Sequence, residues 1–309
     1  MLCPYSYQIH EVSHAEKKRK VNKHWLFYVF TLTGFDIMAH IIVDQDRCTK
    51  CGVCVKICSF GLIDQVDETH FPQVQDINAP HCMYCGHCEA FCPSQALILN
   101  LRPDEKVLLP ADTGAISPKD IGIYLKKRRS IRHFTGEPVP KEKILEVLDI
   151  ARYAASGGNG QPVQWLVIHD SEKVTKIAGL TIEWMKSLLN TAHPMSGFVP
   201  MLISAWEQGT DVICRGAPHL LFAHIPEENP IAPIDAIIAL THFDIAAPAF
   251  EIGTCWAGFV AAAAMSYEPL QKELNLPAGR KIAYAIMFGN PKYKIYGIPR
   301  RKPLEVMWQ

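Results

Sequence analysis

Apolar residues recur along the C-terminal part of the chain with two periods, one helical and one extended. Between Pro140 and Ala155 the apolar positions are three and four residues apart, which predicts a helix with one buried face. Short apolar runs predict buried strands at Trp165–His169, Leu220–Ile225 and Ile282–Phe288. The pattern therefore indicates a folded domain that mixes helices with strands.

End signals indicate two further helices. Ser117 is a suitable N-cap and Asp120 stands three residues later, so a helix is expected from there to about Arg129. The apolar stretch 234–247 predicts a second helix, and Gly253 is expected to close it because glycine commonly follows a helix C-terminus.

Eight cysteines form two runs of the same spacing, C-x2-C-x2-C-x3-C, offset by 34 residues. The first run is Cys48, Cys51, Cys54 and Cys58, and the second is Cys82, Cys85, Cys88 and Cys92. Thiolates at this spacing, used twice, are typical ligands of two 4Fe–4S clusters, so this segment is expected to transfer single electrons. Each half is expected to run as cluster loop, short helical turn and apolar return strand.

Zinc is the alternative occupant of these cysteine runs. Zinc sites usually divide their ligands between two C-x2-C pairs separated by a longer loop, whereas here four cysteines fall within eleven positions. The spacing therefore favours iron–sulfur clusters.

The cysteine segment resembles the bacterial-type two-cluster ferredoxins. In that family three cysteines of one run share a cluster with the last cysteine of the other run. The resemblance therefore implies that one cluster is held by Cys48, Cys51, Cys54 and Cys92, and the other by Cys82, Cys85, Cys88 and Cys58. Ser59 departs from the proline that the family often has there, which leaves the ligands intact and alters the local turn.

Composition narrows the remaining classes. The 309 residues carry 31 Lys and Arg against 31 Asp and Glu, and a neutral chain argues against a nucleic-acid-binding protein. Eleven cysteines, eight of them at cluster spacing, do not indicate a secreted disulfide framework. Because clusters need reduced thiols, a cytoplasmic protein is expected. No membrane span is expected, because the apolar run Trp25–Phe35 is too short to cross a bilayer.

Residues 1–37 are predicted to be a start-site artefact or a disordered extension. Glu11 and Glu16 precede the apolar run and no A-x-A site follows it, which is not typical of a signal peptide. Met38 lies just before a predicted first strand, Ile41–Val43. The domains are therefore predicted as a ferredoxin-like domain at 38–101, a linker rich in proline and glycine at 102–116, and a second domain at 117–309.

Four motifs follow in order in the second domain. The basic segment 126–132 is either a solvated helix end or an anion site, and it does not decide between them by itself. The glycine-rich loop 155–162 lacks G-x-G-x-x-G and Gly-Lys-Ser/Thr, so neither a Rossmann nor a Walker nucleotide site is indicated. The third motif is G-T-C-W-A-G-F at 253–259, where Cys255 is expected to pack in the core, and the fourth is the basic cluster 300–302.

Taken in this order, the four motifs resemble the nitroreductase family over residues 118–309. The resemblance implies an α+β fold, in which a nitroreductase-like α/β sandwich with a mostly antiparallel sheet is preceded by the small two-cluster ferredoxin-like domain. It also implies FMN, bound at the interface of an intertwined homodimer.

Carried over to this sequence, the resemblance implies ten FMN-binding residues. Those expected to hold the phosphate and ribityl chain are Arg128, Ser130, Arg132 and Arg301. Those expected to reach the flavin from the other subunit are Ser156, Gly157, Asn159 and Gln161. The backbone of Ala257 and Gly258 is expected to lie against the isoalloxazine, and no catalytic side chain is implied. Val163 departs from the family, where many members have tryptophan, which leaves the substrate side of the pocket open.

The implied function is an FMN-dependent oxidoreductase that passes electrons from two 4Fe–4S clusters to FMN and on to a small organic acceptor. Nitro compounds, quinones and activated alkenes are the acceptor classes that the family implies. The fused clusters favour a reduced ferredoxin or a similar donor, and NAD(P)H stays open. The alternatives are an electron relay or redox sensor that acts on a protein partner, and the same fold used for dehalogenation or flavin destruction.

Overall fold

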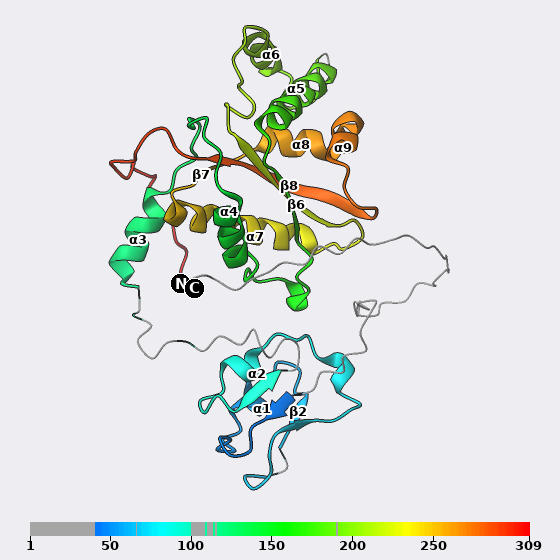
Figure 1. Cartoon of the computed structure of the whole chain (residues 1–309), viewed down its shortest axis with the longest axis vertical. Helices are drawn as coiled ribbons and strands as arrows, with labels where there is room; N and C mark the ends of the chain where they lie inside the picture. Colours follow the sequence, from blue (N-terminus) through cyan, green and yellow to red (C-terminus); the bar gives the residue numbers. More distant parts are fainter. Residues whose placement is uncertain (1–40, 66, 100–108, 110–113, 115, 190) are drawn as a thin grey trace. The chain divides into compact units, whose positions relative to one another are not determined.

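The computed structural model describes residues 41–65, 67–99, 109, 114, 116–189 and 191–309 (Figure 1). The predicted extension at 1–37 and most of the predicted linker at 102–116 lie outside the described residues. The helices and strands lie in two segments, 41–99 and 116–309.

The N-terminal segment has two short antiparallel sheets of two strands each and three short helical turns. Strand β1 (Ile41–Val43) pairs antiparallel with β4 (Leu97–Leu99), and β2 (Ile63–Asp64) pairs antiparallel with β3 (Gln73–Val74). The helical turns are α1 (Val53–Ile57), η1 (Ala79–His81) and α2 (His87–Ala90). The predicted first strand is confirmed as β1. The predicted order of loop, helical turn and return strand is confirmed in both halves, as α1 then β2 and as α2 then β4.

The two halves repeat in backbone conformation as well as in sequence. Three pairs of residues, each 34 positions apart like the cysteine runs, have positive φ angles. They are Lys50 and Tyr84 (57° and 50°), Gly52 and Gly86 (70° and 71°), and Gly61 and Gln95 (62° and 55°). Three of these six residues are not glycine, so the left-handed conformation is imposed by the fold of the cysteine loops and not by residue type alone.

The C-terminal segment is built on a four-stranded, fully antiparallel sheet in the order β5-β6-β8-β7. The strands are β5 (Gln164–Ile168), β6 (His219–Pro226), β7 (Gly253–Trp256) and β8 (Arg280–Gly289). The three predicted strands correspond to β5, β6 and β8. The short edge strand β7 is the one that the apolar pattern does not reveal.

Helices cover both faces of this sheet (Figure 1). One face is covered by α5 (Ser171–Ser187), α6 (Val199–Glu207), α8 (Gly258–Ser266) and α9 (Glu268–Leu274), and the other by α4 (Lys141–Ala151) and α7 (Ala232–Ala246). Strand β6 sends Leu220 and Phe222 to the first core and Leu221 and Ala223 to the second. Because both faces are buried, the centre of β6 is the apolar run 220–223, with the buried His219 and His224 at its two ends. The α+β fold expected from the resemblance is confirmed.

Of the two predicted helix ends, the start of α3 is right and the closure of α7 by Gly253 is wrong. The Ser117 hydroxyl accepts a hydrogen bond from the N–H of Asp120 at 3.0 Å, and α3 (Pro118–Lys127) begins there as predicted. Gly253, however, does not close a helix. After α7 the chain makes the turn η4 (Ala247–Phe250), which ends at Glu251 with a φ of 61°. Gly253 instead begins β7. Glycine is required there by packing, because a Cβ would lie 2.9 Å from the Ile131 side chain.

One helical stretch in the described part of the chain, Ala232–Phe250, has the length and mean hydropathy of a membrane span. It packs against the second face of the sheet and carries two buried aspartates, Asp235 and Asp244. Its apolar composition is therefore that of a core helix.

Buried histidines join the sheet to the start of α4. His219 is fully buried, and its Nε2 accepts a hydrogen bond from the N–H of Val139 at 2.9 Å while its Nδ1 lies 3.0 Å from the carbonyl of His169. Burial, followed by the neighbouring His169, lowers the pKa of His219 to about 4. His219 is therefore neutral in the folded protein at neutral pH.

We expect this histidine to make stability pH-dependent. Between pH 6.5 and about 4 the unfolded chain protonates His219 and the folded chain does not, so the free energy of unfolding falls as the pH falls through this window. His219→Gln should reduce the slope there by up to about 1.4 kcal/mol per pH unit, the value of one proton. Denaturant unfolding followed by tryptophan fluorescence measures this, because five of the six tryptophans lie beyond residue 164. Above pH 7 the two slopes should coincide, and equal slopes below pH 6 would contradict the assignment.

Candidate functional site

Two cavities lie among the cysteines of the N-terminal segment, and each is lined by four thiols. The first is lined by Cys48, Cys51, Cys54 and Cys92. The second is lined by Cys58, Cys82, Cys85 and Cys88. Each cavity thus brings together three cysteines of one run and the last cysteine of the other. Within the described ranges, no three His, Cys, Asp or Glu side chains converge as they would on a single metal ion.

Most of these thiols are partly withdrawn from water, and at three of them burial opposes ionisation. Burial, followed by the nearby thiol of Cys82, raises the pKa of Cys88 to about 12, and burial also raises the pKa of Cys82 and of Cys54. Cys92 differs: burial raises its pKa, but the Ser94 hydroxyl and nearby backbone N–H groups outweigh burial and leave the pKa below its usual value. Buried thiolates need cationic partners, and iron supplies them in a cluster.

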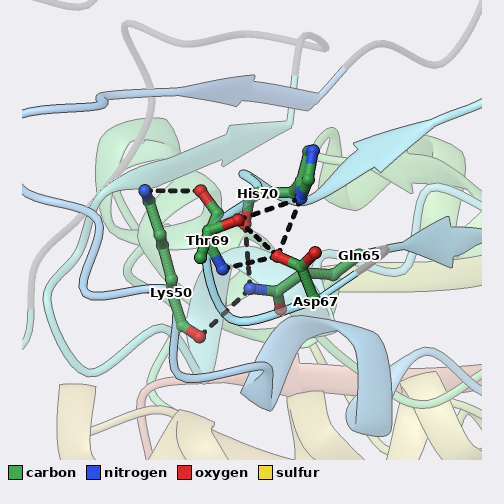
Figure 2. A network of polar contacts seen from close by, with 5 residues as sticks. All are labelled: Lys50, Gln65, Asp67, Thr69 and His70. Carbon is green, nitrogen blue, oxygen red and sulfur yellow. Dashed lines mark hydrogen bonds and ion pairs between the residues drawn. The ribbon is translucent and has the colours of Figure 1, made fainter.

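The loop of the first cysteine run is fixed by Lys50. Its ammonium donates to the carbonyl of Thr69 at 2.7 Å and lies 4.3 Å from the centre of the Phe71 ring. The side-chain amide of Gln65 donates to the carbonyls of Lys50 at 3.1 Å and His70 at 3.0 Å (Figure 2). Lys50 and Gln65 both line the first cavity, so a cation and an amide stand beside its thiols.

The loop whose carbonyl accepts the hydrogen bond from Lys50 is itself held by hydrogen bonds to Asp67. Asp67 accepts hydrogen bonds from the N–H of Thr69 at 2.7 Å and from the Thr69 hydroxyl, and it lies 2.8 Å from Nδ1 of His70 (Figure 2). The bonds from Thr69 and His70 hold the pKa of Asp67 well below its usual range. The carboxylate therefore keeps the loop in the shape that meets Lys50.

In the C-terminal segment, the basic motif 128–132 leaves α3 and runs beside β7. The N–H of Ile131 donates to the carbonyl of Thr254 at 2.8 Å, and the Ile131 side chain packs on Gly253. On either side of Ile131, Ser130 is partly buried and Arg132 is exposed.

Three arginines gather at this motif. The chain after β8 is held against residues 133–135, where the N–H of Thr135 donates to the carbonyl of Asn290 at 2.9 Å. The tail then brings Arg301 close to Arg129. Partial removal from water, followed by repulsion from Arg301 and Arg128, lowers the pKa of Arg129. Guanidiniums that repel one another form a site for an anion.

Arg128 also carries an unused hydrogen-bond donor. Its Nη1 is buried and lacks a hydrogen-bond partner among the described residues, although it lies 3.4 Å from Oδ2 of Asp244 as an ion pair. A buried donor without an acceptor is costly. This atom is therefore a candidate hydrogen-bond donor to an anion.

Asp244, from α7, is the buried partner of this motif. Its Oδ1 accepts a hydrogen bond from the Thr254 hydroxyl, and its Oδ2 accepts one from Nε1 of Trp256 at 3.1 Å. Only 4% of Asp244 is exposed. One carboxylate thus joins α7, the basic motif and strand β7.

The glycine-rich loop is anchored at both ends by other residues. At its start the N–H of Gly157 donates to Oδ1 of Asp235 at 3.0 Å, and at its end Nη2 of Arg280 donates to the carbonyl of Pro162 at 2.9 Å. Arg280 is itself held by His224, whose Nδ1 accepts from its Nε at 2.7 Å. Burial, followed by Arg280, lowers the pKa of His224 to about 4, so this histidine is a neutral acceptor.

Within the loop, the polar residues are ordered by one another. The Ser156 hydroxyl accepts from the N–H of Gln161 at 3.0 Å, and the Gln161 amide donates to Oδ1 of Asn159 at 3.2 Å. Gly158, Asn159 and Gln161 all have positive φ angles, of 57°, 53° and 44°. These values are uncommon outside glycine, and local strain of this kind is frequent at ligand-binding loops.

Ala257 and Gly258 form the junction between β7 and α8. The N–H of Ala257 donates to the carbonyl of Ala285 at 2.9 Å, which holds the junction on the sheet. Ala257 is buried, whereas Gly258 is exposed and begins α8, where a helix leaves its first N–H groups unpaired. A Cβ at Gly258 would lie 3.2 Å from the Tyr284 hydroxyl. Among the described residues, no hydrogen-bond partner is seen for the N–H of Gly258 at the end of β7.

The predicted residues fall into two groups within one chain. The basic motif, the junction at Gly258 and the tail arginine lie with Asp244, whereas the glycine-rich loop lies with Asp235. These aspartates are nine residues apart on α7, about 13 Å along a helix axis. The motifs did not reveal Asp235, Asp244 or Arg280. The available sign was the presence of two aspartates in an otherwise apolar helical stretch.

Two family models match the chain. A model described as the nitroreductase family matches residues 125–290, and one described as a 4Fe–4S dicluster domain matches residues 38–96. The matched ranges correspond to the two segments that carry the arginine cluster and the two cysteine cavities.

The matches to curated relatives are about 70 residues long, close to the length of the cysteine segment. An uncharacterized ferredoxin of Methanocaldococcus jannaschii is 34% identical over 68 residues, covering 21% of this chain and 86% of that protein. The archaeal-type glutamate synthase (NADPH) of Dehalococcoides mccartyi is 37% identical over 70 residues, covering 21% of this chain and 13% of that protein. The chain therefore spans about an eighth of the length of the synthase.

The matches to solved structures of similar fold cover about 60% of this chain, close to the share of the chain that the C-terminal segment makes up. A nitroreductase with bound FMN from Desulfitobacterium hafniense is 19% identical, with a TM-score of 0.49, and the match covers 60% of this chain and 96% of that chain. An oxidized iodotyrosine deiodinase bound to FMN and 3-iodo-L-tyrosine is also 19% identical, with a TM-score of 0.49, over 61% of this chain and 98% of that chain.

Gly253 provides a direct test of the packing between β7 and the basic motif. Gly253→Ala would place a Cβ within 3.0 Å of three Ile131 atoms, including its Cβ, so the backbone of the basic motif must shift. We expect the free energy of unfolding to fall by about 1–3 kcal/mol, the usual cost of overpacking. Gly136→Ala is the matched control, because a Cβ there meets nothing within 4 Å. Equal stabilities of the two variants in denaturant titrations would contradict this packing.

Proposed function

Because the chain belongs to the nitroreductase family and carries a 4Fe–4S ferredoxin-type domain ahead of that match, we propose that it passes electrons from two 4Fe–4S clusters to FMN and on to a small organic acceptor. Family membership makes it an oxidoreductase. The observation that carries the finer proposal is that one chain holds two four-thiol cavities together with an arginine cluster that has an unused buried donor.

The proposed FMN phosphate site is the arginine cluster. Arg128 offers its buried Nη1, Arg129 and Arg301 add positive charge, and the partly buried Ser130 and the exposed Arg132 belong to the same motif. Guanidinium groups suit phosphate because they donate several hydrogen bonds in a fixed plane. When bound, FMN accepts electrons singly and delivers them in pairs, which lets one-electron donors serve a two-electron reduction.

The backbone at Gly258 and the glycine-rich loop are proposed to hold the isoalloxazine. The N–H of Gly258, at the start of α8, would donate a hydrogen bond to the ring. Asn159 and Gln161 carry side-chain amides of a kind that suits the polar edge of a planar heterocycle, and these amides would exchange their present hydrogen bonds for bonds to the ring. Ser156 and Gly157 complete this loop, and Asp235 and Arg280 hold it in shape.

The clusters are proposed to occupy the two cysteine cavities in crossed fashion. Cys48, Cys51, Cys54 and Cys92 would hold one cluster, and Cys82, Cys85, Cys88 and Cys58 the other. Support comes from the way each cavity collects its fourth thiol from the other run. The match to a dicluster model and the ferredoxin relative also favour this occupant over zinc.

A second copy of the chain is proposed to complete each flavin site. The two groups of FMN-binding residues are about 13 Å apart along α7, which is consistent with a phosphate group and a loop that serve different flavins. Ile234 and Ile237 form an exposed apolar stripe on α7, and the tail residues 293–309 are exposed and lie outside any helix or strand. A tail with Tyr296 93% and Trp308 89% exposed would be covered by wrapping a partner.

The proposed donor is a reduced ferredoxin or a similar protein, with NAD(P)H as the alternative, and the proposed compartment is the cytoplasm. The proposed acceptor is a nitro compound, a quinone or an activated alkene. The second candidate function is an electron relay or redox sensor without a small-molecule substrate, favoured by the fused ferredoxin-type domain. Saturable reduction of a small acceptor separates the two, since a relay would reduce only a protein partner.

Cofactor content tests the proposal first. Anaerobically purified protein should contain about eight iron, eight sulfide and one FMN per chain. Arg128→Ala should lower FMN content and leave the iron unchanged, because the arginine and the thiols lie in different domains. Zinc in place of iron, or protein that neither contains nor takes up FMN, would contradict the proposal.

The crossed grouping makes a sharper prediction. Cys92→Ala and Cys48→Ala should each remove the same cluster and leave the same residual electron paramagnetic resonance signal after dithionite reduction, whereas Cys88→Ala should leave the other signal. Cys214→Ala, a buried cysteine outside both cavities, is the control and should retain all the iron. If Cys92→Ala instead matched Cys88→Ala, each run would hold its own cluster.

A further inference from the structure

Asp244 belongs to none of the four motifs, yet it contacts two of them. It lies near the end of α7, is almost fully buried, and meets Arg128 of the basic motif and Thr254 and Trp256 of the third motif. Each of its oxygens accepts a hydrogen bond from β7, and Oδ2 also faces the Arg128 guanidinium at 3.4 Å. The orientation of the carboxylate is therefore fixed from β7, and it presents one oxygen to the arginine.

We propose that Asp244 is a positioning residue for the FMN phosphate, which acts by orienting Arg128. The inference rests on the proposed FMN site. Its geometric basis is that Arg128 Nη1 is held 3.4 Å from Asp244 and keeps an unused donor. The ion pair holds Nη1 of the partly exposed Arg128 side chain against the buried carboxylate, and the free donor is then aimed by the pair and not by the flexible side chain alone.

The arginines of the cluster differ in their charged neighbours: Arg128 is paired with Asp244, whereas Arg129 lies near Arg301. A guanidinium withdrawn from water without a counter-charge is strongly destabilised, and Asp244 supplies that counter-charge for Arg128. Arg129 and Arg301 lie close enough to repel each other, and they supply the positive field that attracts the phosphate. Arg128 therefore contributes geometry, and removing Asp244 should release its side chain toward solvent.

The other buried aspartate of α7 is a built-in contrast. Asp235 accepts from the N–H of Gly157, in the loop proposed to hold the flavin ring, and makes its contact at the opposite end of the helix. If each aspartate serves its own motif, Asp244 should affect recognition of the phosphate and Asp235 recognition of the ring. Both are buried carboxylates on the same helix, so general damage to α7 would affect the two variants alike.

The experiment compares FMN with riboflavin, which has the same ring and lacks the phosphate. Full-length protein is freed of flavin anaerobically, and dissociation constants for both ligands are measured by equilibrium ultrafiltration for the wild type and Asp244→Asn. We expect Asp244→Asn to weaken FMN binding about tenfold, the size of one lost charge-assisted bond, and riboflavin binding less than about twofold. Asp235→Asn should weaken both ligands by the same factor.

A double-mutant cycle tests whether Asp244 acts through Arg128. In an Arg128→Ala background, Asp244→Asn should no longer change the FMN-to-riboflavin preference, because the group that it orients is gone. Thr254→Val, which removes one hydrogen bond to the carboxylate and keeps its charge, should shift the preference in the same direction by a smaller factor. This variant also keeps the test open if Asp244→Asn does not fold.

Three results would overturn the inference. They are an unchanged preference in folded Asp244→Asn, tighter FMN binding in that variant, and an effect of equal size in the Arg128→Ala background. The proposed function fails separately. If the wild type did not bind FMN, or bound it no better than riboflavin, the phosphate site itself would be wrong, whereas a wild type that prefers FMN leaves only the role of Asp244 in question.

Discussion

A buried carboxylate must be paired, and this requirement organises the second domain. Helix α7 carries two such groups, Asp235 and Asp244, inside an otherwise apolar packing layer. Their partners are the glycine-rich loop at one end of the helix, and the basic motif with strand β7 at the other. The helix that fills the core is therefore also the frame on which the candidate flavin residues are arranged.

The ferredoxin-type domain is organised differently, by repetition. The cysteine loops adopt the same left-handed backbone angles in both halves, and two antiparallel pairings close the repeat on itself. This closure delivers Cys58 and Cys92 to the cavity of the opposite run. Around the first cavity, Lys50 and Gln65 add a cation and an amide that the second does not have among its lining residues, so the proposed clusters would sit in unequal surroundings.

Several local predictions from the sequence were right because they depend on near neighbours. Apolar runs located β5, β6 and β8, and the serine at 117 marked the start of α3. The same local reasoning failed at Gly253, which was expected to end a helix. Its lack of a side chain serves the approach of Ile131, a residue more than 120 positions earlier in the chain, and no local pattern reveals such a neighbour.

By itself the sequence determined the two cysteine runs, the order of the four motifs and a mixture of helices with strands, because spacing and periodicity are local properties of the chain; the α+β fold class came from the family resemblance. The tertiary structure brought together the thiol groups that the ferredoxin resemblance had implied, and it alone decided that Arg301 returns to Arg129 and that Asp244 joins Arg128 to β7. The physical reason is that these groups are far apart in the chain. They come together when helices pack on both faces of one sheet. The role of a buried charge can be assigned only when the group that it pairs with is known.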